Sequence, residues 1–166
     1  ANQYAKAVED YDAVLEMKPE DKAALAGRSI AYHHLGKEKK AIEDLNKLIA
    51  ADPKRAVGYN NRAWSFLAAG QPATALADCE RALSLDSRLA TAYDTKAVAL
   101  LNLRRYQDAL ACVNKSIDIA SDGAAYYHRA EILMSLGRLE DSLPDFARAE
   151  KLKYKPETWE LQTAVI

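Results

Sequence analysis

The sequence repeats itself with a period of 34 residues, and this repetition constrains the fold more than any other feature. Residues 22–55 read KAALAGRSIAYHHLGKEKKAIEDLNKLIAADPKR, and they align with residues 56–89, which read AVGYNNRAWSFLAAGQPATALADCERALSLDSRL. Residues 90–122 and 123–155 continue the alignment as two units of 33 residues. Self-similarity at a fixed period predicts a stack of one supersecondary unit in which each copy contacts its neighbours. We therefore expect a single repeat domain over residues 1–166.

Each unit predicts two helices. In residues 56–89, Tyr59, Ala63 and Phe66 recur at spacings of four and three, which places them on one face of a helix. Gly70 ends this first helix, and a second apolar stripe begins at Ala75. The other units follow the same pattern, so each is expected to be a helix, a short turn and a second helix.

Small residues recur at one slot of each predicted helix, where they let a neighbouring helix approach closely. The first-helix slot holds Ser29, Ala63, Ala97 and Ala130, and the second-helix slot holds Ala7, Ala41, Ala75, Ala109 and Ser142. Glycines at 36, 70 and 137 mark the turns, and Arg104 replaces the turn glycine of the third unit. With the second-helix motif A-x-x-x-F matched by Ala41-x-x-x-Leu45 and Ser142-x-x-x-Phe146, the chain resembles the tetratricopeptide repeat family.

The resemblance implies an all-α fold, a right-handed superhelical solenoid of antiparallel helix-turn-helix hairpins. Residues 2–21 match a second helix alone and form half a unit, while residues 156–166 match the start of a further or capping helix. Apolar side chains at these two ends are candidates for self-association, which would give a weak homodimer: Tyr4, Val8, Tyr11, Leu15 and Trp159. The alternative is that the first helix frays at its end.

Composition argues against several classes of partner. The 23 Lys and Arg residues balance 24 Asp and Glu residues, so no strong field attracts nucleic acid. No run of about 18 apolar residues predicts insertion into a membrane. The two cysteines, Cys79 and Cys112, lack the paired spacing of a zinc site or a disulfide framework, which fits a reducing compartment such as the cytoplasm.

The family resemblance also implies that the first helices line a concave groove. The candidates are first-helix residues outside the packing stripe: Ile30, His33, His34, Asn60, Asn61, Trp64, Leu67, Asp94, Thr95, Val98, Asn102, Tyr127, His128 and Glu131. Trp64 follows Ala63 directly, so it points away from the packing stripe and would anchor a partner, unless it packs over a neighbouring helix. Asn61 resembles the asparagines that hold a peptide backbone, the alternative being a solvated polar residue.

One branch of the family grips acidic chaperone tails with a carboxylate clamp of lysine, arginine and asparagine. Asn61 matches the central asparagine of that clamp. Ala26 and Ile30 stand at the first pair of clamp slots, however, and Thr91 and Thr95 stand at the last pair. Without cations at those slots nothing offsets the desolvation of a carboxylate. We therefore do not expect binding of chaperone tails.

Catalysis, cofactors and metals are not expected. His33 and His34 are adjacent rather than four residues apart, and the repeat spacing separates them from His128. These histidines are expected to be solvated or to line the groove. Cys79 occupies a core slot, where an inert thiol is expected, and the many Asp and Glu residues are interpreted as solvated outer faces.

The sequence therefore predicts a scaffold that binds a peptide or a helical segment of another protein. Two alternatives remain open. The chain could be a self-assembly module that acts through its terminal helices, or it could be a regulatory arm of a larger multidomain enzyme.

Overall fold

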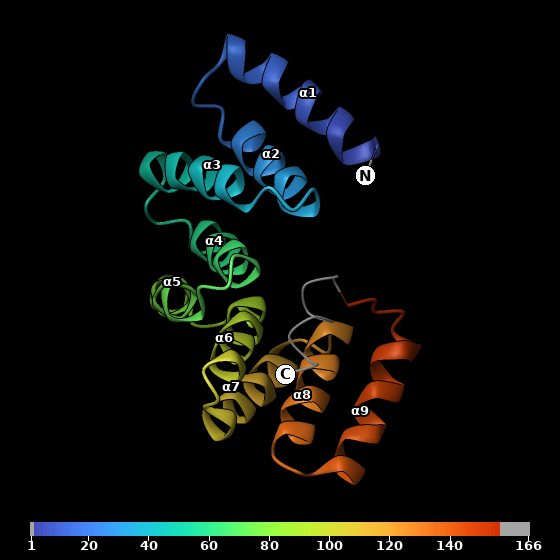
Figure 1. The fold of residues 1–166 in the computed structure, drawn as a ribbon. Coiled ribbons are helices and arrows are strands. Elements are labelled where there is room, and N and C mark those ends of the chain that lie inside the picture. The colour runs from blue at the N-terminus through green and yellow to red at the C-terminus, as the bar shows by residue number, and fades with distance from the viewer. Residues whose placement is uncertain (1, 157–166) are drawn as a thin grey trace.

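The computed structural model of the chain describes residues 2–156, and the helices within this range form an array of hairpins (Figure 1). Their bounds are α1 Asn2–Met17, α2 Lys22–His34, α3 Glu38–Ala51, α4 Ala56–Ala68, α5 Pro72–Leu85, α6 Ala90–Asn102, α7 Tyr106–Ile119, α8 Gly123–Ser135 and α9 Leu139–Lys151. Residues 2–156 contain no strand. The expectation of an all-α solenoid is confirmed.

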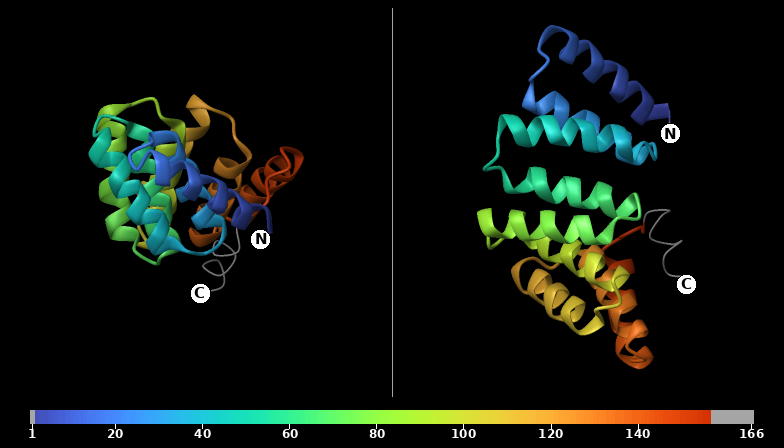
Figure 2. Two further views of the ribbon diagram at one scale, coloured as in Figure 1. Left: turned by 90° about the horizontal axis from the view of Figure 1, so that it is seen from above. Right: turned by 60° about the vertical axis from the view of Figure 1, so that its left-hand side comes forward.

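The helices stack in chain order from α1 at one end to α9 at the other (Figure 2). Each helix packs against the next one, and α6 also contacts both α4 and α8. In Figure 1 the stack bends into an arc that places α3, α5 and α7 on its outer side. The first helices α2, α4 and α6 therefore contribute to the inner wall. The unit boundaries drawn from the sequence remain a prediction.

The turns inside the hairpins depend on a residue with positive φ. Gly36, Gly70 and Gly137 have φ of 66°, 71° and 74°, a region open to residues without a Cβ atom. Arg104 adopts the same conformation with φ of 59°, and the following amide still donates to the carbonyl of Leu100 at 2.9 Å. The third hairpin therefore keeps the turn that glycine makes in the others, because its backbone hydrogen bonds hold Arg104 in place.

The small-residue slots lie at the helix contacts, as the repeat predicts. Ala63 and Ala97 of the first helices are fully buried, and so are Ala75 and Ala109 of the second helices. Each has no room for a larger side chain, since protein interiors are packed at close to crystal density. The contacts at these slots set the spacing of the whole array.

A row of ion pairs joins neighbouring hairpins and was not predicted from the sequence. The Arg28 guanidinium donates through Nε and one terminal nitrogen to the two carboxylate oxygens of Asp44, each at 2.7 Å, and through the other to Asp12 at 2.6 Å. Arg62 repeats the pattern. It donates to both carboxylate oxygens of Asp78 in its own hairpin, each at 2.7 Å, and to Oδ1 of Asn46 in the preceding helix α3. The last hairpin has the same arginine–aspartate pair, and two-point pairs of this kind fix orientation as well as charge.

We call the pairs that Arg28, Arg62 and Arg129 form with these aspartates the arginine ladder. It corrects the interpretation that the acidic residues form solvated outer faces. Asp44, Asp78 and Asp145 are buried, with exposed fractions of 3%, 8% and 6%. Hydrogen bonds to Asp78 and Asp145 raise the pKa of Arg62 and Arg129, so both guanidinium groups stay charged. The signal was present in the sequence as an arginine and an aspartate 16 residues apart in three of the units.

The third hairpin lacks the ladder pair and uses a different one. Lys96 stands at the arginine slot and Cys112 at the aspartate slot. Lys96 reaches back to Glu80 of α5 at 3.2 Å, so the link to the preceding hairpin is kept while the link within the hairpin is lost. Cys112 offers no carboxylate for a guanidinium to bind in two-point fashion, and the residue at the arginine slot is a lysine.

The first helix is covered more fully than the sequence suggested. Leu15 is buried against Leu25 and Leu45, and Tyr11 lies half-buried over Gly27. Tyr4 is exposed at one edge and stacks on His34, with ring centroids 4.3 Å apart. The expectation that this stripe is free for self-association is therefore wrong for Leu15, which is buried in the contact with α2, and it stays a prediction for the half-buried Tyr11. Val8 is half-buried on the same helix, and Trp159 lies outside the described residues.

We expect the arginine ladder to contribute measurably to stability. Asp78→Asn removes the charge opposite Arg62 in a largely buried pair, and the free energy of unfolding should fall by about 2 kcal/mol. Glu80→Gln is the matched control, because Glu80 is exposed in its pair with Lys96 and its loss should cost less than about 1 kcal/mol. Urea unfolding followed by circular dichroism compares the two. Equal small losses would show that the ladder adds little.

Gly27 should be intolerant of a side chain although it lies inside a helix. A Cβ atom at this position would overlap the Tyr11 ring, so Gly27→Ala should displace α1 and lower the free energy of unfolding by about 1–2 kcal/mol. Gly58→Ala is the control, since its Cβ would make an ordinary contact with Ile49 at 3.4 Å and should stabilise the helix by up to about 1 kcal/mol.

The contact between Gly27 and Tyr11 can be isolated in a Tyr11→Ala background. There the added Cβ has no ring to displace, so Gly27→Ala should become neutral or stabilising by up to about 1 kcal/mol. Hydrogen exchange of the α1 amides is measured for wild type, Gly27→Ala, Tyr11→Ala and the double variant, and it shows whether the loss of stability lies in α1. A loss that persists without the Tyr11 ring would contradict this account.

Candidate functional site

A pocket of about 340 Å³ lies between the first helices α2, α4 and α6 and the segment after α9 that contains Tyr154 and Lys155. Eight of the residues expected in the groove line it: Ile30, His33, His34, Asn60, Asn61, Trp64, Asp94 and Thr95. Thr91, which the sequence placed on the same wall, lines it too, whereas sequence reasoning did not select the others: Ser29, Leu45, Ser65, Asp122, Ala124, Tyr154 and Lys155. The last four come from segments after α7 and α9, which only the curvature of the array brings beside α4.

Trp64 lies on the middle helix of this pocket, α4. It is half-buried, packs against the core cluster that contains Ala63 and Leu67, and lines the pocket at the same time. Its ring centroid lies 6.0 Å from that of His128 on α8, at an interplanar angle of 55°. The two interpretations of Trp64 are thus compatible, since the ring packs over a neighbouring first helix and also forms part of the pocket wall.

The two asparagines of α4 have different environments. Asn61 is half-buried and lines the pocket. Asn60 also lines the pocket but is only 8% exposed, and its Oδ1 accepts no hydrogen bond within the structure of the described chain. A buried acceptor left without a donor costs about 1–3 kcal/mol. Asn60 is therefore the unusual residue of this pair, although the sequence drew attention to Asn61.

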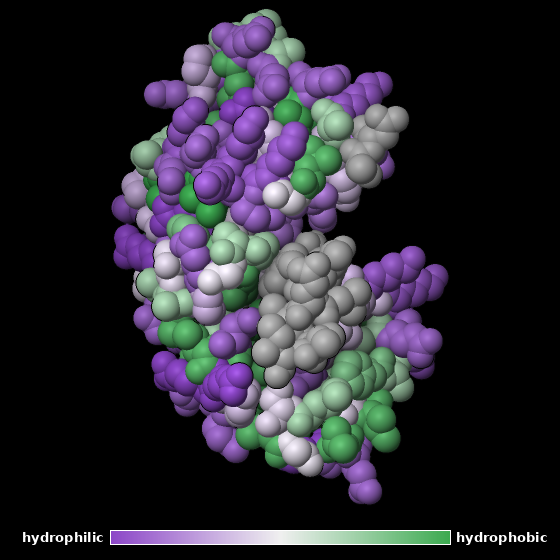
Figure 3. Space-filling model, in the orientation of Figure 1, coloured by the Kyte–Doolittle hydropathy of each residue, from purple (hydrophilic) through white to green (hydrophobic). Residues whose placement is uncertain are grey.

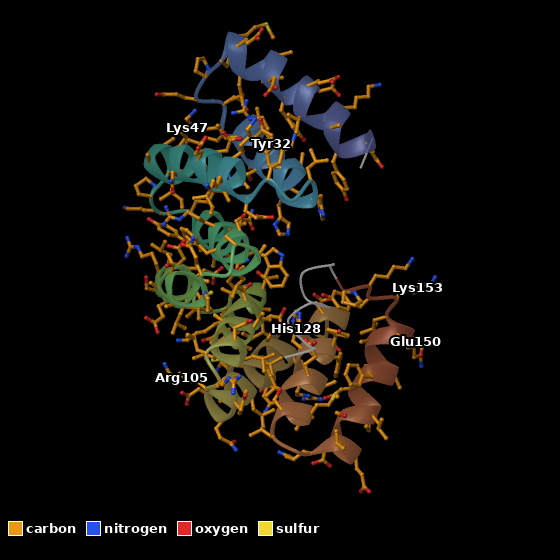
Figure 4. All side chains as sticks on the ribbon, viewed as in Figure 1. Tyr32, Lys47, Arg105, His128, Glu150 and Lys153 are labelled. Atoms are coloured by element: carbon orange, nitrogen blue, oxygen red, sulfur yellow. The ribbon has the colours of Figure 1, made fainter. Side chains whose placement is uncertain are left out.

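His128, which is labelled in Figure 4, forms a buried pair with Asp94. Its Nδ1 lies 2.9 Å and 3.0 Å from the two carboxylate oxygens of Asp94, across the contact between α6 and α8. The imidazole is 1% exposed. The expectation of a solvated or groove-lining histidine is wrong here, because Asp94 holds the ring inside. The sequence signal was an aspartate and a histidine at adjacent slots of consecutive units.

Several other groove candidates lie elsewhere. Leu67 and Val98 are 5% and 4% exposed and belong to the core cluster around Ala63, so their assignment to the groove was wrong. Both side chains belong to a cluster that includes Ala75 and Cys79 of α5, and burial of apolar surface there is favourable. Asn102 is exposed at the end of α6 and donates to the carbonyl of Val98 at 2.9 Å. Tyr127 packs its ring against Phe146 and Tyr154, and Glu131 is half-buried on α8.

The remaining two histidines lie together at the α2 side of the pocket. His33 Nδ1 lies 3.0 Å from Glu38 Oε2, and the His34 ring stacks on Tyr4. Within residues 2–156 no group of three or more histidine, cysteine or acidic side chains is arranged to hold a metal ion.

The cysteines are poor nucleophiles. Cys79 is fully buried in the core, as predicted, and burial raises the pKa of its thiol to about 12. Burial also raises the pKa of the half-buried Cys112 thiol. The thiolate is the reactive form of cysteine, and burial disfavours it at both positions.

The hydropathy of the visible surface varies along the array. Figure 3 shows hydrophilic side chains over most of the visible surface of α1 to α5, with hydrophobic ones gathered toward α9. Leu139 and Leu143 of α9 are 59% and 66% exposed. None of the helices in the described range is long and apolar enough to cross a lipid bilayer.

Known proteins share this arrangement of helices. A thermophilic TPR protein from Thermus thermophilus has 21% identity and a TM-score of 0.83, with 99% of this chain and 90% of that chain covered. MamA has 20% identity and a TM-score of 0.72, covering 99% and 93%. The first TPR of Spaghetti (RPAP3), bound to the HSP90 peptide SRMEEVD, has 24% identity and a TM-score of 0.65, covering 70% and 93%.

Sequence comparison gives the family. Curated protein sequences give no match to the chain. The tetratricopeptide repeat profile matches residues 1–56, 60–124 and 95–155, which together span nearly all of the described residues. With the hairpin array, the buried alanine slots and the positive-φ turns already established, the chain belongs to the tetratricopeptide repeat family.

Proposed function

We propose that the chain is a non-catalytic scaffold that binds a peptide segment of a partner protein in the pocket around Trp64. The observation that carries the proposal is the pocket itself, which spans three successive first helices and is lined by side chains from each. Its volume of about 340 Å³ falls in the usual range for binding sites, which is about 300–1,000 Å³. Proteins of this family generally act as scaffolds, in keeping with the proposal.

Trp64 is the anchor that we assign to this site. A tryptophan offers a large rigid surface at low entropic cost, and tryptophans are enriched among the residues that dominate binding energy. Its indole is held on one side by the core around Ala63, so little ordering is needed when a partner arrives. Ile30 of α2 lines the same pocket and is 48% exposed, which extends the apolar surface along the wall.

An acidic tail of the kind bound by the first TPR of RPAP3 does not suit this pocket. That domain holds the HSP90 peptide SRMEEVD, which ends in an acidic stretch. In this chain the inner wall presents Thr91 and Thr95 at slots where a carboxylate clamp has cations, and Asp94 stands between them. A carboxylate placed there would be desolvated beside another negative charge. The partner is therefore of a different chemical class.

Selection from a random peptide library tests the proposal. A display library of peptides about 15 residues long is panned against the intact chain, and the affinity of enriched peptides is measured by calorimetry. Trp64→Ala should weaken their binding about thirtyfold, which is the loss of a strong anchor residue. The same change should leave the array folded, because Trp64 is only half-buried.

Leu143→Ala on α9 is the matched control for lost apolar surface. Leu143 is 66% exposed outside the pocket, so its removal should leave affinity unchanged. Peptides that bind equally well to wild type and Trp64→Ala, but lose affinity with Leu143→Ala, would place the binding surface on α9 and refute the proposal. Concentration-dependent mass in light scattering without peptide would instead favour the self-assembly alternative.

A further inference from the structure

Asn60 carries an unmet hydrogen-bonding capacity within the pocket wall. It is 8% exposed, it lines the pocket, and its Oδ1 is the buried side-chain polar atom of the described chain that has no hydrogen-bond partner. A half-turn of the amide exchanges its oxygen and nitrogen with almost no change in shape, so the acceptor can face the pocket without movement of the backbone. A donor supplied by a ligand would then pair with this acceptor, which has no partner within the described chain.

Two carboxylates line the same pocket. Asp94 accepts from His128 through both oxygens, and each oxygen retains a further lone pair. Asp122 is exposed just before α8, and its side chain makes no capping hydrogen bond to the described backbone of that helix. Lys155, in the segment that follows α9, is the one lysine among the described residues that line the pocket. The acceptors around Asn60 therefore outnumber the charged donors.

Trp64 completes the set. It lies four residues after Asn60 on α4, so the two side chains share one face of the helix. An aromatic face attracts a cation through its quadrupole and also accommodates an aliphatic stem. A side chain with an apolar stem and a cationic head matches this combination of an indole, an unpaired amide oxygen and two carboxylates.

We propose that the pocket binds a lysine or arginine side chain of the partner peptide, with its stem against Trp64 and its head donating to Asn60 and the neighbouring carboxylates. The inference rests on the proposed function and names the chemistry that the site selects. An acidic side chain would meet like charges. An apolar side chain would leave Asn60 unpaired and would desolvate Asp94 without compensation.

Small probes test the inference without any peptide. N-acetyl-arginine amide and N-acetyl-lysine amide are titrated into the ¹⁵N-labelled chain, with the norleucine and glutamate analogues as comparisons. The cationic probes should shift the resonances of the Asn60 side chain and the Trp64 indole at millimolar concentration. Equal shifts with norleucine, or larger shifts with glutamate, would overturn the inference.

Asn60→Leu removes the acceptor while keeping side-chain volume. It should weaken binding of the arginine probe about tenfold, the loss typical of a hydrogen bond to a charged group. Asn102→Leu is the control outside the pocket and should change binding by less than about threefold, because Asn102 is exposed at the end of α6. The melting temperature of Asn60→Leu should match wild type or exceed it by about 2 °C, because an unpaired polar atom is lost. A fall in melting temperature with unchanged probe binding would show that Asn60 has a structural role instead.

The carboxylates are tested by a change at the exposed Asp122. Asp122→Asn should weaken the arginine probe about threefold, as expected for a partly solvated ion pair. Glu20→Gln, in the exposed loop between α1 and α2, makes the same change in net charge away from the pocket and should leave probe affinity unchanged. Equal effects of the two variants would indicate a general field of the molecule and contradict a specific site.

The library-selected peptides separate this inference from the proposed function. Their sequences should be enriched in lysine or arginine, and replacement of the key arginine by neutral citrulline should weaken binding to wild type more than to Asn60→Leu. Peptides that depend on Trp64 but carry no such residue would refute the cationic specificity and leave the scaffold proposal intact. Failure to select any Trp64-dependent peptide would refute the scaffold proposal, while the probe titration would still decide the chemistry of the pocket.

Discussion

Close approach of neighbouring helices at the small-residue slots is the constraint on which the rest of the structure depends. Ala63, Ala75, Ala97 and Ala109 are all fully buried where helices meet. A solenoid has no central core, and each unit is stabilised by contact with its neighbours alone. The distance between first helices is therefore decided at these alanines. That distance in turn sets how far Trp64 on α4 lies from Asp94 on α6.

The arginine ladder adds orientation to this spacing. Apolar contact is not directional, so helices packed through alanine alone could rotate against one another. A guanidinium that bonds two oxygens of one aspartate and reaches the preceding hairpin fixes the relative rotation of three helices, as Arg28 and Arg62 do. The third hairpin replaces this device with the single contact of Lys96 to Glu80. Its inner side carries Asp94, which is held instead by His128 of the next hairpin.

The pocket combines side chains that are held in place with one amide whose acceptor lacks a hydrogen bond. Trp64 and Asp94 are held from behind by the core and by His128, so they are oriented before any partner binds. Asn60 lies on the same wall with an unpaired acceptor. A buried polar atom without a hydrogen-bond partner is expected at a functional site rather than in the repeated scaffold. This contrast between scaffold and pocket is why the chemistry of the ligand can be argued from a few side chains.

The sequence alone determined the repeated architecture, because helix period, small-residue slots and turn glycines act within one unit or between adjacent ones. It therefore predicted the all-α array, the buried alanines and eight of the residues that line the pocket. Only the tertiary structure decided what lies beside those residues. The pairing of His128 with Asp94 and the burial of Leu67 depend on contacts between neighbouring hairpins, and the approach of Tyr154 to α4 depends on the curvature of the whole array. That curvature is a sum of small rotations at many contacts, and no single position in the sequence encodes it.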